Sequence, residues 1–164
     1  MDLTESRQAT ILAVDDVPGN LKTLTSCLGS EYNLLLAKSG ESCLELVANQ
    51  EVDLILLDIV MPEMDGYEVL RRLKAEEASA EIPVIFLTGR MDVQDEAKGL
   101  MLGADDYILK PPNCTLLNAR VKTQLICYKN KLIIEQKVQE RTQQLKQELL
   151  TAKQRVAELE ALSR

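Results

Sequence analysis

Short apolar runs alternate with amphipathic segments along the first two thirds of the chain. A continuous apolar run bounded by turn residues is typical of a strand buried on both faces, whereas apolar residues at every third or fourth position indicate a helix. The runs predict strands at residues 10–14, 32–37, 54–58, 83–88 and 106–110. The segments between them predict helices over 21–28, about 40–49, just after Gly66 and about 93–102. Asn20 is the predicted N-cap of the first helix, after a turn at Pro18 and Gly19.

This order of elements decides the fold class. Strands that alternate with helices through short connections form a parallel sheet with helices on both faces and right-handed crossovers. The predicted fold is therefore α/β, a flavodoxin-like doubly wound five-stranded parallel sheet in the order 2-1-3-4-5. The carboxyl ends of such strands meet at one edge, where ligands bind.

The last third of the chain has a different pattern, because no glycine or proline occurs from Thr115 to Arg164. We expect one long helix there. The side chains expected to pack on the sheet at its beginning are Leu116, Leu117, Val121 and Leu125. Further on, apolar residues recur at alternating spacings of four and three, the period of a coiled coil. The predicted dimerisation positions are Val138, Leu145, Leu149, Val156 and Leu159. The period changes before this stripe, so a local register defect is expected near Glu135.

The charges beside this stripe favour parallel pairing of two copies. The flanking pairs across a parallel dimer would be Arg141–Lys146, Glu148–Lys153 and Arg155–Glu160, of which the last two attract. Each exposed pair contributes only tenths of a kcal/mol. A single solvated helix is the alternative, but one of about 50 residues with one apolar stripe would be marginally stable alone. We predict a folded domain over 1–125 and a coiled-coil dimerisation helix over 126–164, continuous with the last helix of that domain.

Composition excludes several classes of protein. No apolar run approaches the ~18 residues of a membrane span, so no membrane insertion is expected, and residues 1–10 are polar and acidic, unlike a signal peptide. The four cysteines lack CxxC spacing, which predicts reduced thiols in a cytoplasmic protein. The chain contains no histidine, which excludes imidazole metal sites and Ser-His catalysis.

The net charge of −7 is unevenly distributed. Residues 1–112 carry 21 acidic and 9 basic side chains, whereas residues 113–164 carry 5 acidic and 10 basic ones. An acidic folded domain argues against nucleic acid as its ligand. A DNA-binding basic helix is the alternative for the C-terminal part. Its basic residues are interspersed with apolar ones, and a solvated helix face explains them better.

Polar residues end four of the predicted strands: Asp15 and Asp16 the first, Asp58 the third, Thr88 the fourth and Lys110 the fifth. Each alone is common as a helix cap, a turn residue or a surface charge, but together at one sheet edge they predict a site. Three carboxylates repel one another unless a cation joins them, and their hard oxygens suit Mg²⁺. With Mg²⁺ present, Asp58 would attack a phosphoryl group and form an acyl phosphate. Lys110 and the Thr88 hydroxyl would then stabilise the phosphoryl oxygens.

The same motifs resemble the response-regulator receiver domains of two-component signalling over about residues 8–125. The matching segments are Val14-Asp15-Asp16, Leu57-Asp58-Ile59-Val60-Met61-Pro62 with Asp65-Gly66, Leu87-Thr88-Gly89 and Leu109-Lys110-Pro111. The resemblance implies that Asp58 is the phosphoacceptor. It also implies that Asp16, Asp58 and the Val60 carbonyl hold Mg²⁺ directly, with Asp15 acting through water.

The resemblance further implies that Lys110 contacts the phosphoryl group and precedes a cis bond to Pro111. Thr88 and Tyr107 would form the switch pair, with the hydroxyl moving to the phosphoryl oxygen and the ring turning inward behind it. The implied partner is a sensor histidine kinase or a phosphotransfer protein. No enzyme activity is implied beyond self-phosphoryl transfer and autodephosphorylation.

The output is left open by the sequence. Phosphorylation of Asp58 is expected to change the face made by the fourth helix, fifth strand and fifth helix, and with it the coiled-coil dimer. The chain is either a receiver with a dimerising helix or the regulatory N-terminal part of a larger protein. The output enzyme would then be a cyclic-dinucleotide enzyme, a kinase or a phosphatase. A phosphatase within this chain would require a second carboxylate where Val60 stands, and a nucleotide-binding module would require a glycine-rich loop after the first strand.

Overall fold

The computed structural model describes residues 7–89, 97–99 and 101–163. The strands are β1 (Thr10–Val14), β2 (Asn33–Ala37), β3 (Leu54–Asp58), β4 (Val84–Thr88) and β5 (Asp106–Leu109). The helices are α1 (Pro18–Leu28), α2 (Gly40–Asn49), α3 (Gly66–Ala75) and α5 (Cys114–Leu162). Of the helix predicted over about 93–102, residues 97–99 and 101 are helical, and residues 93–96 and 100 lie outside the described residues.

The strands form one five-stranded sheet in the order β2-β1-β3-β4-β5, and every pairing is parallel. The predicted fold class and strand order are confirmed. The register pairs Val14 with Leu57, Asp58 with Leu87, and Thr88 with Leu109. The ends of β1, β3, β4 and β5 therefore lie in step at one edge, so the polar residues that end them are neighbours.

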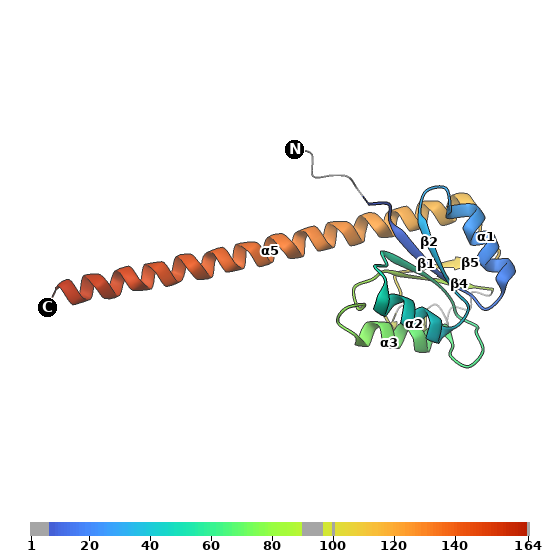
Figure 1. Cartoon of the computed structure of the whole chain (residues 1–164), viewed down its shortest axis with the longest axis horizontal. Helices are drawn as coiled ribbons and strands as arrows, with labels where there is room; N and C mark the ends of the chain where they lie inside the picture. Colours follow the sequence, from blue (N-terminus) through green and yellow to red (C-terminus); the bar gives the residue numbers. More distant parts are fainter. Residues whose placement is uncertain (1–6, 90–96, 100, 164) are drawn as a thin grey trace. The chain divides into compact units, whose positions relative to one another are not determined.

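Helices cover both faces of this sheet (Figure 1). One buried cluster includes Val69, Leu70 and Leu73 of α3 with Cys43 of α2 against alternate strand residues. The other includes α1 and the first turns of α5, where Leu117, Val121 and Leu125 are buried as predicted. The prediction was wrong for Leu116, which is 48% exposed, because consecutive helical residues point about 100° apart and Leu117 faces the sheet.

The first helix begins earlier than predicted. Pro18 is the first residue of α1, and Val17 precedes it in extended conformation. Proline costs no helical hydrogen bond at this position, because the N–H of a first helical residue has no partner within the helix. Asn20 is therefore in the first turn and is not the N-cap. The other caps follow the usual chemistry, since Ser39 accepts a hydrogen bond from the Ser42 N–H at α2, and Asp65 accepts one from the Glu68 N–H at α3.

The expectation of reduced thiols was wrong for two of the cysteines. Cys27 at the end of α1 and Cys114 at the start of α5 form a disulfide bond, with a Cα–Cα distance of 5.1 Å. Their sequence separation is 87 residues, so only the fold brings them together. Cys43 is a buried free thiol and Cys127 an exposed one.

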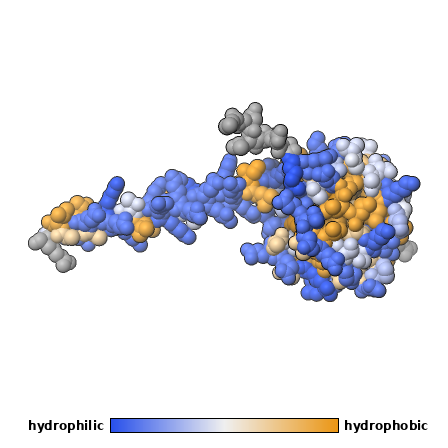
Figure 2. All heavy atoms as spheres, in the orientation of Figure 1, coloured by the Kyte–Doolittle hydropathy of each residue, from blue (hydrophilic) through white to orange (hydrophobic). Residues whose placement is uncertain are grey.

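The chain divides into two compact units, residues 1–128 and 129–164. Within the second unit α5 is helical without a break, and hydrophobic atoms occur on it in patches between hydrophilic surface (Figure 2). The exposed apolar side chains there include Val138, Leu145, Leu149, Val156 and Leu159. Among the described residues, no helix combines the length and the apolar character needed to cross a membrane.

Candidate functional site

The site begins with two carboxylates on adjacent central strands. Asp58 is the last residue of β3, and Asp15 directly follows Val14 of β1, the residue paired with Leu57. The Asp15 N–H donates to the Ala37 carbonyl at 3.1 Å, which extends the β1–β2 ladder by one residue. Asp15 and Asp58 are 0% and 5% exposed. The sheet therefore holds two acidic groups side by side and largely out of water.

The buried carboxylate of Asp15 has a full set of partners. It accepts hydrogen bonds from the Val17 N–H at 2.9 Å and from the Asn20 side-chain amide at 3.0 and 3.1 Å. Lys110 Nζ lies 2.5 Å from its Oδ2. These donors satisfy the hydrogen-bonding capacity of a carboxylate that is removed from water.

Lys110 contacts the carboxylates of both Asp15 and Asp58. Its Nζ lies 2.5 Å from Asp15 Oδ2 and 3.0 Å from Asp58 Oδ1. The Lys110 N–H donates to the Thr88 carbonyl at 2.8 Å, which holds the end of β5 against the end of β4. The Lys110–Pro111 peptide bond is cis, as the family resemblance implied. One ammonium thus serves both acids.

The environment of Asp58 acts on its carboxyl in two directions. Burial is the largest influence and raises the pKa of this carboxyl above its usual value. Lys110 opposes that shift by hydrogen bond and charge, whereas the charge of Asp15 reinforces it. The Val60 N–H donates to Asp58 Oδ1 at 3.3 Å, a further contact that favours the charged form. Asp58 is an acid whose charge depends on nearby cationic groups.

The turn after β3 brings backbone close to Asp58. The Gly66 N–H donates to the Ile59 carbonyl at 2.8 Å, and a Cβ on Gly66 would collide with the Asp58 carbonyl oxygen and the Ile59 Cα. Glu63 within this turn has a positive φ of 67°. Glycine is therefore required at position 66 by close approach, and the turn fixes the orientation of β3's last residues.

Three carboxylates are suitably placed for a cation. Asp15, Asp16 and Asp58 each offer an oxygen, and these oxygens lie within 4.8 Å of one another. Mg²⁺ binds oxygens at about 2.0–2.1 Å in an octahedron, so oxygens on opposite sides of the ion are about 4.1 Å apart. The hard-oxygen donor set suits Mg²⁺, and the limit of 4.8 Å is slightly wider than the span of one ion's ligands.

Thr88 and Tyr107 lie on β4 and β5, the two strands that follow β3 in the sheet. Thr88 ends β4 and is buried. The Tyr107 ring of β5 is also buried, with its centroid 5.5 Å from that of Phe86. A Cβ on Gly99 would clash with the Tyr107 hydroxyl, so this glycine leaves room for the ring. Tyr107 is thus in an inward position in this structure.

Sequence reasoning missed the role of Asn20. Its side chain lies on Asp15 because α1 starts at Pro18 and its first turn passes over the end of β1. The available signal was Pro18, which stands two residues after Asp16 at the end of β1. Proline favours the first helical position, so it indicated that the helix begins there.

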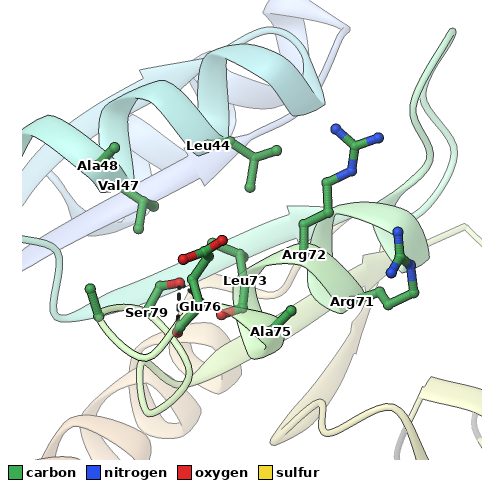
Figure 3. A pocket seen from close by; sticks show the side chains of 10 residues that line it. Leu44, Val47, Ala48, Arg71, Arg72, Leu73, Ala75, Glu76 and Ser79 are labelled. Carbon is green, nitrogen blue, oxygen red and sulfur yellow. Dashed lines mark hydrogen bonds between the residues drawn. The ribbon is translucent and has the colours of Figure 1, made fainter.

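A separate hollow of about 490 Å³ lies between α2 and α3 (Figure 3). Its apolar wall includes Leu44, Val47 and Leu73, and Arg71 and Arg72 lie at its rim. Those on α3 lie in its second half, at least about 7.5 Å along the helix from Gly66. The hollow is therefore distinct from the acidic site, whose residues do not line it.

The family model for the response regulator receiver domain matches residues 11–122. The chain belongs to this family, and it is a receiver domain of two-component signalling with a long C-terminal helix. Receiver domains of this class accept phosphoryl groups from histidine kinases and bind Mg²⁺ at an acidic pocket.

Individual relatives agree with this assignment. Over 125 residues the chain is 46% identical to a probable cyclic di-GMP phosphodiesterase of Vibrio cholerae, an alignment covering 76% of this chain and 28% of that protein. Response regulator PleD of Caulobacter vibrioides is 39% identical over 116 residues, covering 70% of this chain and 26% of PleD. The chain thus spans less than a third of the length of either relative.

Solved structures show the same fold. The signal receiver domain of an HD domain-containing protein from Pseudomonas fluorescens superposes with a TM-score of 0.71 at 29% identity, covering 76% of this chain and 99% of that one. A CheY-like response regulator receiver domain protein from Methanospirillum hungatei gives a TM-score of 0.71 at 28% identity, with the same coverage.

Proposed function

We propose that Asp58 accepts a phosphoryl group from a histidine kinase or a phosphotransfer protein in the cytoplasm, in a reaction that requires Mg²⁺. The observation that carries this proposal is the contact of Lys110 Nζ with the carboxylates of both Asp15 and Asp58, at 2.5 and 3.0 Å. A nucleophilic carboxylate beside a cation and two further acids is the arrangement that phosphoryl transfer needs.

The transfer forms one bond and breaks one. An Asp58 carboxylate oxygen bonds to phosphorus while the P–N bond of the donor's phosphohistidine breaks, and the imidazole keeps the electron pair. The Lys110 ammonium is within reach of oxygens on a phosphoryl group carried by Asp58. Mg²⁺, held by Asp16, Asp58 and the Val60 carbonyl with Asp15 acting through water, would neutralise charge on the phosphoryl oxygens.

The switch in this proposal is the pair Thr88 and Tyr107. Thr88 ends the strand next to Asp58, so its hydroxyl is on the element that adjoins the acceptor. The Tyr107 ring packs against Phe86 of the same strand. A shift of Thr88 toward the phosphoryl group would be accompanied by closer packing of Tyr107 behind it.

The proposed output is a parallel dimer formed by the C-terminal helix. The folded domain would comprise residues 1–125 and the dimerisation helix residues 126–164. The apolar side chains Val138, Leu145, Leu149, Val156 and Leu159 are all at least half exposed in the single chain, and pairing would bury them. Phosphorylation of Asp58 would alter how the two helices pair.

A second candidate places this chain as the regulatory part of a longer protein. The observation that favours it is the 46% identity with a probable cyclic di-GMP phosphodiesterase of which the match covers only 28%. In that case the phosphorylation state of Asp58 would control an output enzyme acting on a cyclic dinucleotide.

The test is incubation with a small phosphodonor and Mg²⁺, with intact mass and oligomer size measured on the same samples. The wild type is expected to gain one phosphoryl group, and Asp58→Asn none. Glu63→Gln is the matched control, because Glu63 is an exposed acid in the turn after Asp58 and should label like the wild type. Equal labelling of wild type and Asp58→Asn would refute the assignment of the acceptor.

A further inference from the structure

The disulfide joins the two helices that cover one face of the sheet. Cys27 is in the last turn of α1, and Cys114 is the first residue of α5. The Asn118 side-chain amide donates to the carbonyl oxygens of both Cys27 and Cys114, each at 3.0 Å. We call these three residues the α1–α5 clasp. The start of α5 is thus tied to α1 by one covalent bond and one shared amide.

Both helices also lead directly to the acidic site. At its other end α1 carries Asn20, which donates to Asp15. Cys114 follows Lys110 by four residues. A small cavity of about 30 Å³ is lined by residues from both connections, including Asp15, Asn20, Lys110 and Pro111. The clasp therefore fixes the position of two elements that each hold part of the site.

The two cysteine residues of the disulfide differ in exposure. Cys27 is only 9% exposed, whereas Cys114 lies in an exposed position at the helix start. A thiolate from solution can thus approach Cys114 first, and the buried Cys27 is the leaving group. Structural disulfides are usually protected from exchange, and the rare disulfides of cytoplasmic proteins are usually transient or redox-sensing.

We propose that Cys27–Cys114 is a thiol–disulfide switch, opened by a dithiol reductant, that controls how firmly the start of α5 is held to α1. A thiolate of the reductant attacks Cys114 Sγ, the S–S bond breaks, and Cys27 leaves as a thiolate that takes up a proton. The second thiol of the reductant then displaces Cys114 and forms the reductant's own disulfide. Two electrons and two protons pass to the protein, which ends with two thiols.

Opening the clasp changes only the start of the helix. Leu117, Val121 and Leu125 remain buried against the sheet, so α5 stays docked. The hydrogen bond from the Asn118 amide to the Cys27 carbonyl oxygen still links the start of α5 to α1. The effect of the clasp on signalling rests on the proposed phosphorylation of Asp58, because only then does α5 have a signal to transmit. The thiol–disulfide exchange itself does not depend on that phosphorylation.

The test uses the full chain with Cys127→Ser, which removes the exposed thiol outside the clasp. Dithiothreitol is added under native conditions, samples are quenched in acid and unfolded, and thiols are counted by alkylation and intact mass. The expected count rises from one, Cys43, to three. Amide hydrogen exchange in the first two turns of α5 should become at least about tenfold faster, while β1 and β3 do not change. Release of thiols only upon unfolding, or unchanged exchange after reduction, would overturn the proposal.

Two variants separate the covalent tie from the hydrogen bonds. In the double variant Cys27→Ser with Cys114→Ser, amide hydrogens at the start of α5 should exchange rapidly, and dithiothreitol should not change their rate. Asn118→Ala keeps the disulfide, so its oxidised form should match the oxidised parent, whereas its reduced form should exchange faster than the reduced parent. Equal exchange of both reduced forms would count against the clasp, even if the serine variant does not fold.

Repeating the exchange measurement with a small phosphodonor and Mg²⁺ distinguishes this inference from the proposed function. If Asp58 labels, the change in α5 exchange that accompanies labelling should be larger in the reduced chain, and equal changes would refute control of signalling by the clasp. If Asp58 does not label, the proposed function fails, and the donor-free measurements still decide whether the clasp is a switch.

Discussion

Lys110 Nζ lies 3.0 Å from Asp58 Oδ1, although the two residues end different strands that are not adjacent in the sheet. The same ammonium lies 2.5 Å from Asp15 Oδ2. Burial raises the pKa of the Asp58 carboxyl, and Lys110 opposes that rise. Lys110 is therefore the protein's own cation in a site that also suits Mg²⁺, and the two cations should partly substitute for one another.

This relationship predicts the effect of Lys110→Ala. Two buried carboxylates would lose their shared cation, and the free energy of unfolding should fall by about 3 kcal/mol without Mg²⁺. Added Mg²⁺ should recover more stability in the variant than it contributes to the wild type, because it replaces the missing positive charge. Urea unfolding with and without Mg²⁺ measures both quantities.

Lys38→Ala is the matched control for that measurement. Lys38 is an exposed lysine just after β2, and its loss should change the free energy of unfolding by less than about 0.5 kcal/mol, whether or not Mg²⁺ is present. An equal gain from Mg²⁺ in the wild type and in Lys110→Ala would contradict the substitution of one cation for the other.

Gly66→Ala should distort the site by sterics alone. The added Cβ would collide with the Asp58 carbonyl oxygen and the Ile59 Cα, both of them backbone atoms that cannot rotate away. We expect a loss of about 2 kcal/mol or more in the free energy of unfolding and weaker Mg²⁺ binding. Gly19→Ala, in the first turn of α1, meets no atom within 4 Å and should be neutral or stabilising. Urea unfolding and Mg²⁺ titration of both variants test this, and similar losses in the two would disprove the steric argument.

The sequence predicted the sheet well, and it predicted that the strand-end residues lie close together, for a shared reason. Each buried strand is a continuous apolar run, and parallel strands in this topology bring their carboxyl ends to one edge, so Asp15, Asp58 and Lys110 had to meet. What it could not decide depends on tertiary packing. Leu116 and Leu117 are adjacent leucines, and only the rotation of α5 against the sheet determines which is buried.

Two further misses have the same origin. Pro18 and Asn20 are both good helix-start residues, and the position of Asp15 beneath the first turn favours the earlier one. The Cys27–Cys114 pairing joins residues 87 apart and carries no local signal. Local pattern therefore predicts elements and their order, whereas contacts between elements require the fold.

Glu68 should make a measurable contribution to the pH dependence of stability. Hydrogen bonds from Arg71 and then Arg72 lower the pKa of this carboxyl from 4.5 to about 2. A lowered pKa in the folded state stabilises the protein above pH 4.5, and the contribution is lost as the pH falls from 4.5 toward 2. The free energy of unfolding of Glu68→Gln should therefore fall less than that of the wild type over this window, as measured by urea unfolding at a series of pH values.

The arginines provide the control for Glu68. In a chain with Arg71→Gln and Arg72→Gln, the carboxyl loses both of its donors, so adding Glu68→Gln should no longer change the slope of stability against pH. If Glu68→Gln alters the slope equally with and without the arginines, the cause is not this ion-pair cluster.

The dimer proposal can be tested with two adjacent leucines on α5. Leu149 lies on the apolar stripe and Leu150 lies outside it. The two side chains are equally accessible in the single chain, at 56% and 58% exposed, so only their position relative to the stripe differs. Leu149→Asp would place an unpaired carboxylate in each half of the dimer interface and should weaken dimerisation by about 3 kcal/mol, roughly a hundredfold in the dissociation constant. Leu150→Asp makes the same substitution on the solvent-facing side of the helix. Its dissociation constant should stay within about twofold of the wild-type value. Sedimentation equilibrium of the two variants measures this, and equal weakening would show that the chains do not pair through the predicted stripe.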